Sequence, residues 1–336
     1  MKIKFVLIGT GKNAHRHARA MLSLKNTELI AVFSKSKERS EKFAEKYKIK
    51  SYTDYNELLK NKEINAIDIV NINNLHGDFG ILGAKAGKHI LVEKPIDVSL
   101  EKTEQLIKVC EENKVKLSVI SQHRFDSALQ WTKKEIEKEN LGNLIFGNIS
   151  IKWNRSKDYY ESSEKWRKLN EFSGGGVLII QAIHYIDLLL WIFGDVKSVY
   201  GKIDTKLHEI EGEDTAVAIL KFKSGAIATI EATTAVVKTL KDKLEVHGTK
   251  GSIILEGNKV INRVKTINIE KHQIKKRIIS YFKLKNGFIK DQIQDFVDSI
   301  IYNKEPSITG MDGKKALEVV LSIFKSSNLS KEIILK

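Results

Sequence analysis

The stretch Ile3-Lys-Phe-Val-Leu-Ile-Gly-Thr-Gly-Lys-Asn-Ala14 decides the fold of the chain. It joins an apolar run to a turn of the form G-x-G-x-x-A, and a helical pattern follows. Glycines at such a turn let main-chain N–H groups and a helix N-terminus approach a pyrophosphate. The stretch therefore predicts a dinucleotide-binding βαβ unit, whose candidate cofactor residues are Gly9, Gly11, Lys12, Asn13 and Ala14.

A second apolar run, His89-Ile-Leu-Val92, ends in Glu93, Lys94 and Pro95. The carboxyl ends of parallel strands open into the crevice where the ligands of such sheets bind. An ammonium at that position lies beside a bound dinucleotide and is suited to proton transfer. We therefore expect Lys94 to be catalytic and to contact the cofactor, with Glu93 holding it in place in the cofactor site.

The order of apolar runs predicts an α/β fold in two parts. Up to Ser121, continuous apolar strands alternate with helical patterns, which indicates right-handed βαβ units in a doubly wound parallel sheet. Later strands alternate in polarity and flank short turns at 223–225 and 248–251, which favours antiparallel hairpins. We expect an NAD(P)-binding Rossmann domain at 1–122. An α+β domain with an open-faced, mainly antiparallel sheet should follow at 123–336, for substrate binding and oligomerisation, with its C-terminal helix free to pack back on the first domain.

Length and composition limit the class of protein. The chain has 336 residues, one cysteine and a net charge of +15. A single Cys110 excludes an internal disulfide and a cysteine metal cluster, and we expect no metal site. The sequence has no apolar run of about 18 residues and no signal-peptide pattern at its start, so we expect a cytoplasmic protein without a membrane partner.

The basic charge invites a nucleic-acid interpretation, which the composition does not favour. Only eight of the 57 basic residues are arginine, and the lysines are spread along the whole chain. We therefore expect no nucleic-acid partner. The densest stretch, 271–285, should be solvated or face another subunit, with polyanion contact as the alternative. Because lysine is so common, each arginine is the more informative residue.

The cofactor type depends on the end of the second strand. Ser34 and Lys35 stand there, with Arg39 a turn later, instead of the acid that would bond the ribose 2′-OH of NAD. A hydroxyl with cations suits a 2′-phosphate, so NADP is slightly favoured over NAD, unless these are ordinary surface lysines. Other candidate cofactor contacts at the sheet edge are Asn71, Asn73, His76 and Gln122, although Asn is also a common turn residue.

A strongly apolar helix is predicted over 177–193, after Gly174-Gly-Gly176. Gln181, His184 and Asp187 share one face of it. A polar stripe on a buried helix must find partners in the core or at a ligand. We favour a catalytic His184 over a hydrogen-bonded core histidine, with Gln181 and His184 contacting the substrate.

Arginines and aromatic residues gather between the two halves of the sequence. Arginine forks suit carboxylates and phosphates, and flat rings suit sugar or base faces, although Trp153 also fits the core of the second sheet. The candidate substrate-binding residues are Arg124, Trp153, Arg155, Tyr159, Trp166 and Arg167, with Tyr160 beside them.

These motifs together resemble the Gfo/Idh/MocA oxidoreductase family over nearly the whole chain. The likeness rests on the glycine turn, on Ala86-Gly-Lys-His-Ile-Leu-Val-Glu-Lys-Pro95, on the run from Gly174 to His184 and on the tail from Glu305 to Glu318. The resemblance implies a Rossmann domain, an open-faced antiparallel α/β domain, NAD(P), and oxidation or reduction of sugars or diols. It carries catalytic roles onto Lys94 and His184.

Motifs in the second half are similar to bacterial dehydrogenases that oxidise C3 of UDP-N-acetylglucosaminuronate for surface polysaccharides. These motifs are Gln122-His-Arg-Phe125, Trp153-Asn-Arg155, Tyr159-Tyr160, Trp166-Arg167 and Gln181-x-x-His184. Two features depart from that pattern. Ile180 stands where many members carry an acid or amide, and the subgroup generally uses NAD, whereas Ser34-Lys35 favours NADP.

We therefore expect an NAD(P)-dependent dehydrogenase acting on the CH-OH group of a sugar or nucleotide sugar. One of Lys94 and His184 removes a hydroxyl proton while the carbinol hydride passes to the nicotinamide. The open sheet face should be covered by another subunit in a homodimer or homotetramer. Two alternatives stay open: a keto-sugar, diol or inositol-type dehydrogenase or reductase, and a dinucleotide-binding regulator without turnover.

Overall fold

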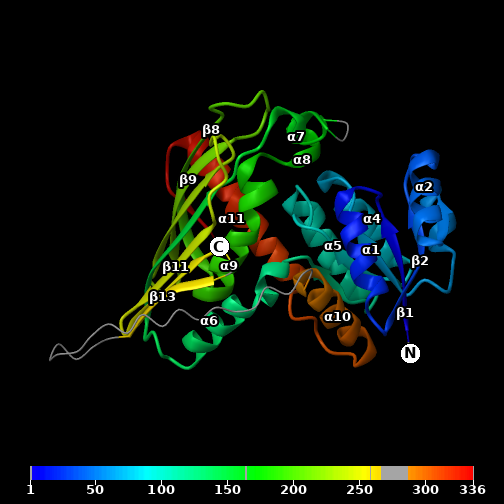
Figure 1. The fold of residues 1–336 in the computed structure, drawn as a ribbon, viewed down its shortest axis with the longest axis horizontal. Coiled ribbons are helices and arrows are strands. Elements are labelled where there is room, and N and C mark those ends of the chain that lie inside the picture. Colours follow the sequence, from blue (N-terminus) through cyan, green and yellow to red (C-terminus); the bar gives the residue numbers. More distant parts are fainter. Residues whose placement is uncertain (1, 163–164, 258, 266–286, 336) are drawn as a thin grey trace. The chain divides into compact units, whose positions relative to one another are not determined.

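The computed structural model describes residues 2–162, 165–257, 259–265 and 287–335, and these form two compact units. The first unit comprises Met1–Gln122 and Lys285–Leu317, and the second comprises His123–Leu284 and Glu318–Lys336. Each unit has its own sheet (Figure 1). The lysine-rich stretch 271–285, discussed above for its charge, lies outside the described residues.

The first unit contains a six-stranded sheet in the order β3-β2-β1-β4-β5-β6, and every neighbouring pair is parallel. This confirms the predicted doubly wound parallel sheet. Its strands are β1 (Ile3–Ile8), β2 (Thr27–Phe33), β3 (Lys50–Tyr52), β4 (Ala66–Ile69), β5 (His89–Val92) and β6 (Leu117–Val119). Its helices are α1 (Lys12–Leu22), α2 (Lys37–Tyr47), α3 (Tyr55–Leu59), η1 (Asn73–Leu75), α4 (His76–Lys85), α5 (Leu100–Glu112) and α10 (Gly287–Ile301).

Helix α10 belongs to the first unit although it is far along the chain. Its side chains Ile293, Phe296 and Val297 are fully buried in the same hydrophobic cluster as Phe5 and Leu7 of β1. The side-chain amide of Gln292 also binds the main chain at the end of β6. Its Nε2 donates to the Val119 carbonyl (2.7 Å), and its Oε1 accepts the N–H of Ser121 (3.0 Å). Apolar burial and these two hydrogen bonds hold α10 on the parallel sheet.

The second unit contains an eight-stranded mixed sheet, in the order β13-β12-β11-β7-β10-β9-β8-β14. Only the β7–β10 pair is parallel, which confirms the predicted mainly antiparallel sheet. Its strands are β7 (Leu144–Lys152), β8 (Val196–Asp204), β9 (Thr215–Phe222), β10 (Ile227–Thr233), β11 (Lys243–Gly248), β12 (Gly251–Glu256), β13 (Lys259–Lys265) and β14 (Ile333–Ile334). Its helices include α6 (Ser127–Glu137), α7 (Lys157–Glu161) and α8 (Asn170–Ser173). The elements η2 (Gln122–Phe125) and α11 (Gly310–Leu329) begin in the first unit and end in the second.

One face of this second sheet is buried and the other is open. Along β9, Ala216, Ala218 and Leu220 are buried, whereas Val217 and Ile219 are about half exposed, at 53% and 49%. This period of two is the pattern of a sheet with one covered face. The open-faced sheet expected from the sequence is therefore present.

The helix predicted over 177–193 is divided. Residues Leu178–Ala182 form a π-helical turn, and the α-helix α9 begins only at Ile183 and ends at Phe193. The prediction of one continuous α-helix is wrong here. At the start of the segment the Glu213 carboxylate accepts the N–H groups of Gly176 (2.9 Å) and Leu178 (2.7 Å), as a helix cap does. Such π-turns are often found at functional sites.

The helical segment Asn170–Phe193 has the length and apolar composition of a membrane-spanning helix. However, 89% of its most apolar part is buried inside the protein, as in the core helix of a globular domain. The segment packs on the second unit's own sheet and supplies much of that unit's apolar core.

Candidate active site

The glycine turn of the first unit leaves room for a ligand at the start of α1. Gly9 has a φ of 118°, and a Cβ there would lie 2.9 Å from the Val70 carbonyl oxygen, so only glycine fits. A Cβ on Gly11 would meet no protein atom within 4 Å. No side chain caps α1, whereas Ser36 caps α2 and Asp54 caps α3. The open N–H groups and the free space fit a pyrophosphate.

The end of β2 carries hydroxyls and cations, as the sequence indicated. Ser34 Oγ accepts the N–H of Ser36 at 3.2 Å, and Ser36 Oγ accepts the N–H of Arg39 at 3.3 Å as the cap of α2. Lys35 and Arg39 are exposed beside them. This edge therefore presents positive charge and no carboxylate between residues 34 and 37.

The three residues predicted to contact the cofactor after β4, which are Asn71, Asn73 and His76, have different surroundings. His76 is fully buried, and its ring nitrogens lie 2.7 Å from the Pro95 carbonyl and 3.3 Å from the Asn71 carbonyl. Both ring nitrogens therefore bind the main chain, and His76 links the segment after β4 to the segment after β5. Its predicted contact with the cofactor stays a prediction. Asn71 Oδ1 is buried and has no hydrogen-bond partner in the described part of the chain, so it stays a candidate contact, as does the buried Asn73.

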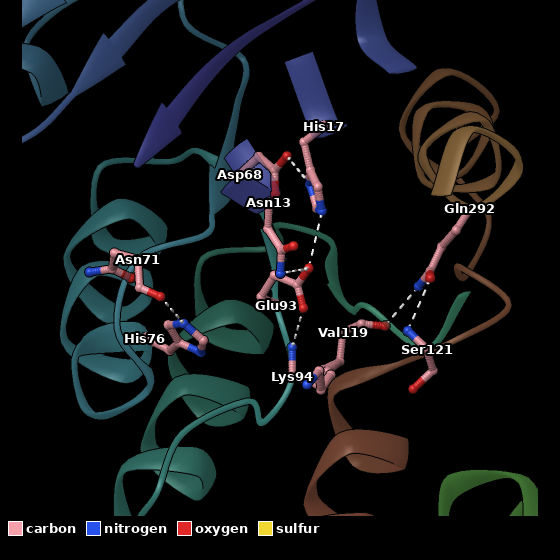
Figure 2. Close-up of polar contacts among 10 residues, drawn as sticks. All are labelled: Asn13, His17, Asp68, Asn71, His76, Glu93, Lys94, Val119, Ser121 and Gln292. Carbon is pink, nitrogen blue, oxygen red and sulfur yellow. Dashed lines mark hydrogen bonds and ion pairs between the residues drawn. The ribbon is translucent and has the colours of Figure 1, made fainter. Parts of the chain in front are cut away.

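The strand β5 delivers Lys94 to the same edge of the sheet, and Glu93 just before it is buried. Figure 2 shows that the Glu93 carboxylate faces protein donors: Asn13 Nδ2 at 3.3 Å, His17 Nε2 at 3.2 Å and the main-chain N–H of Lys94 at 3.1 Å. Glu93 is therefore held beside Lys94 by donors of the protein, and its place among the cofactor residues stays a prediction.

In the second unit, α9 and the π-turn before it present Gln181 and His184. The His184 imidazole is 9% exposed and packs edge-on against His123, with ring centroids 5.0 Å apart. Gln181 is 3% exposed; its Nε2 donates to Tyr159 Oη (3.1 Å), and its Oε1 is buried without a partner in the described residues. A buried acceptor of this kind is costly unless a ligand or water satisfies it.

Arg124, by contrast, is already paired. Its Nε and Nη2 donate to the two carboxylate oxygens of Asp187, at 2.8 and 2.5 Å, and both side chains are buried. The Arg124 guanidinium therefore neutralises the acid on the polar stripe of α9, and its contact with substrate stays a prediction.

Arg155 and Arg167 surround one aromatic ring. Their guanidinium carbons lie 5.0 and 4.7 Å from the Tyr159 ring centroid, and they also lie over Trp153 (5.0 Å) and Trp166 (4.5 Å), respectively. Neither arginine forms an ion pair with any carboxylate among the residues described. Arg155 is still near enough to Asp242 for its charge to lower the pKa of that carboxyl group. Two partly buried cations held between flat rings, with no direct ion pair to a described residue, fit an anionic ligand.

A carboxylate missed by sequence reasoning supports this aromatic group. Asp242 accepts hydrogen bonds from Trp153 Nε1 and Tyr185 Oη. Burial raises the pKa of Asp242, and these two donors oppose the rise. Its signal in the sequence was weak, since Asp242 lies among lysines in a loop. No group of three or more His, Cys, Asp or Glu side chains able to hold a metal ion occurs within the described ranges.

Two family models match the chain. Residues 3–121 match the oxidoreductase family, NAD-binding Rossmann fold, and residues 133–335 match the oxidoreductase family, C-terminal alpha/beta domain. Both descriptions carry the Gfo/Idh/MocA label, and together they span both units.

By sequence the chain is similar to inositol dehydrogenases. It is 25% identical to myo-inositol 2-dehydrogenase of Thermotoga maritima, over 93% of this chain and 92% of that protein. It is 27% identical to scyllo-inositol 2-dehydrogenase (NAD(+)) of Bacillus subtilis, over 97% and 94%. By structure it is similar to the WlbA dehydrogenase of Bordetella pertussis in complex with NADH and UDP-GlcNAcA, with a TM-score of 0.90, 27% identity and coverage of 100% and 99%.

Proposed function

The chain belongs to the Gfo/Idh/MocA family of oxidoreductases, and we propose that it oxidises a nucleotide sugar with NAD(P) as hydride acceptor. The specific reaction we propose is oxidation at C3 of a UDP-N-acetylhexosaminuronate for surface-polysaccharide synthesis. A cytoplasmic location and a homodimer or homotetramer belong to the same proposal.

The observation that carries this substrate is the arginine pair around Tyr159. A free inositol or glucose offers only hydroxyl groups, which neutral partners bind well. A UDP-uronate offers a diphosphate and a carboxylate, for which a guanidinium fork is the natural partner. Arg155 and Arg167 form no direct ion pair with a carboxylate in the described chain, and Arg155 interacts with Asp242 only at longer range, so both guanidinium groups can still bind such a ligand.

Sequence relatives and structural relatives favour different substrates. The sequence relatives named above act on inositols, and the WlbA structure holds UDP-GlcNAcA. An inositol-type dehydrogenase is therefore the second candidate, and it is supported by identity over most of the chain. The paired arginines and the unsatisfied Gln181 Oε1 favour the larger, charged substrate.

The residues of this chain have separate roles in the proposed reaction. The turn Gly9–Ala14 and the open N-terminus of α1 hold the dinucleotide, which when bound supplies the hydride chemistry. Lys94 and His184 are the proposed acid–base groups for the hydroxyl proton. Gln181 orients the sugar through its free oxygen. A regulator without turnover would have no use for an intact Lys94 and His184, so we favour an enzyme.

Binding measurements on arginine variants test this proposal. Arg155→Ala and Arg167→Ala should each weaken binding of UDP-GlcNAcA by about tenfold or more, the cost of losing a charge-assisted hydrogen bond, while the affinity for the dinucleotide stays within about threefold. Added salt should weaken the wild-type contact as well, because the arginines are only partly buried.

Arg263→Ala is the matched control. Arg263 also lies over a tryptophan, Trp131, in the second unit, but it is paired with Glu135. Its removal should leave sugar binding unchanged. Unchanged calorimetric affinity in both Arg155→Ala and Arg167→Ala would contradict the nucleotide-sugar proposal and leave the inositol alternative.

A further inference from the structure

A chain of buried charged groups lies beneath the catalytic edge of the first unit. His17, on the inner face of α1, is fully buried between two carboxylates: its Nδ1 lies 2.7 Å from Asp68 Oδ2, and its Nε2 lies 3.2 Å from Glu93 Oε1 (Figure 2). Asp68 is the only acid in β4 and is also fully buried. His17 lies in α1, Asp68 in β4 and Glu93 directly after β5, so the three residues link these elements beneath the sheet edge.

Glu93 connects these buried charged groups to two parts of the proposed active site. Its Oε1 also accepts Nδ2 of Asn13, in the glycine turn, at 3.3 Å, and its Oε2 accepts the main-chain N–H of Lys94 at 3.1 Å. One carboxylate therefore holds both the dinucleotide-binding turn and the main chain from which the Lys94 side chain extends. A shift of that carboxylate would move both.

The three groups shift one another's pKa values. Burial alone would lower the pKa of His17, but Asp68 and Glu93 outweigh it and raise the pKa to about 10, so the ring is an imidazolium. Burial raises the pKa of Glu93, and His17 more than reverses this, so the net direction is down. Burial also raises the pKa of Asp68 against the opposing imidazolium, so Asp68 and His17 titrate as a pair.

We propose that His17 is a positioning residue for the acid–base lysine: it holds the Glu93 carboxylate as the acceptor that sets the main chain at Lys94 and the side chain of Asn13. This inference rests on the proposed role of Lys94. His17 does not itself exchange protons with substrate, because it is fully buried and both its ring nitrogens are occupied.

A purely stabilising role explains the arrangement less well. Burying two carboxylates and an imidazolium is expensive, and apolar residues of similar volume would often stabilise a fold as well or better. The group makes sense where geometry matters, since a misplacement of about 1 Å at a reacting group can cost on the order of 10²-fold in rate.

A double-mutant cycle between His17 and Glu93 tests the proposal. His17→Gln should lower kcat by about 10- to 100-fold, with KM for the sugar changed by less than about threefold. In a Glu93→Gln background the same His17→Gln change should cost less than about threefold, because its effect passes through Glu93. A residue that only stabilises the fold would cost the same in both backgrounds.

The pH dependence of turnover is the second readout. The titratable groups facing Glu93 are His17 from α1, Asp68 from β4, His76 from α4 and its neighbour Lys94. Without the imidazolium, Asp68 and Glu93 share a buried site and one takes up a proton. His17→Gln should therefore gain a pH-dependent limb between about pH 6 and 9 that the His17→Gln/Glu93→Gln double variant lacks.

His15→Gln is the matched control, since His15 lies on the same helix but contacts Tyr47 and Phe43; its kcat should stay at the wild-type level. Asp68→Asn, which keeps an acceptor for His17, replaces His17→Gln if that variant does not fold and should show the same dependence on Glu93. Equal losses in both backgrounds, or no loss, would overturn the proposal.

All rates are measured with whichever compound the wild type oxidises, nucleotide sugar or free polyol. If only a polyol is oxidised, the substrate proposal fails and the cycle still decides the role of His17. If UDP-GlcNAcA is oxidised and the cycle shows no coupling, the substrate proposal stands and the His17 proposal fails.

Discussion

The guanidinium of Arg124 and the carboxylate of Asp187 form a buried two-point ion pair, with Nε to Oδ2 at 2.8 Å and Nη2 to Oδ1 at 2.5 Å. The pair fastens η2 to α9 within the second unit. Since Asp187 is 2% exposed, it has no access to water that would solvate it if Arg124 were removed. The pair is therefore a structural element beside the candidate site.

Removing one partner of this pair should destabilise the protein strongly. Arg124→Met leaves an unpaired buried carboxylate, and we expect a loss of about 3–5 kcal/mol in the free energy of unfolding. The double variant Arg124→Met/Asp187→Leu should recover most of that loss, because no buried charge remains. Denaturant titration measures both. An Arg124→Met variant of wild-type stability that binds the sugar poorly would place Arg124 among the substrate ligands.

The two glycines of the cofactor turn should respond differently to alanine. Gly11→Ala meets no protein atom within 4 Å, so the loss in unfolding free energy should be about 1 kcal/mol or less, while the methyl group obstructs the pyrophosphate. Gly9→Ala combines a φ of 118° with a 2.9 Å contact to Val70 and should cost about 1–3 kcal/mol. Thermal unfolding and dinucleotide titration separate the two effects. Wild-type dinucleotide affinity in Gly11→Ala would argue against a pyrophosphate at this turn.

The stability of the protein should carry the signature of His17 at alkaline pH. The folded-state pKa of His17 is raised from 6.5 to about 10, so the folded state binds the proton more tightly than the unfolded chain. This contribution is full below about pH 6.5, decreases as the pH rises, and is lost above about pH 10. The difference in unfolding free energy between wild type and His17→Gln should therefore shrink over that window. A constant difference between pH 6 and 10 would show that His17 is not charged in the fold.

Ser34 should set the choice between the two cofactors. The β2 edge has no acid between residues 34 and 37, so we expect NADP to bind at least as well as NAD. Ser34→Asp should shift the preference toward NAD, because a carboxylate accepts the ribose 2′-OH and repels a 2′-phosphate. Calorimetry at fixed salt compares both cofactors. Tenfold tighter binding of NAD to the wild type would contradict the prediction.

Periodicity in the sequence predicted the first unit well, because strands buried on both faces are continuous apolar runs and glycine marks the cofactor turn. It predicted β1 to the residue and placed Lys94 directly after β5. In the second unit the alternation of apolar residues along β7 is confirmed by the buried Ile149 and Ile151.

Tertiary partners account for the failures. The π-turn at Leu178–Ala182 has the same apolar pattern as an α-helix, so helical periodicity could not predict it. Glu213, which binds the start of the segment, is distant in the sequence. In the sequence, His17 looks like an ordinary polar residue of a helix. The single acid Asp68 in an otherwise apolar strand does indicate that a buried cation is needed beside it. In the same way Asp187, on an apolar helix, required a partner, and Arg124 was the scarce cation that supplied it.

The rate of nicotinamide reduction with a panel of nucleotide sugars and free polyols tests the central claim most directly. The account predicts that the wild type oxidises UDP-GlcNAcA, with kcat/KM at least about 10²-fold above that for myo-inositol, scyllo-inositol or glucose, a difference within reach of two charge-assisted contacts. Lys94→Ala and His184→Ala should each lose about 10²-fold or more in turnover, as expected for a positioned acid or base. Rapid oxidation of a free inositol with no response to any UDP-sugar would contradict the account and establish an inositol-type dehydrogenase in its place.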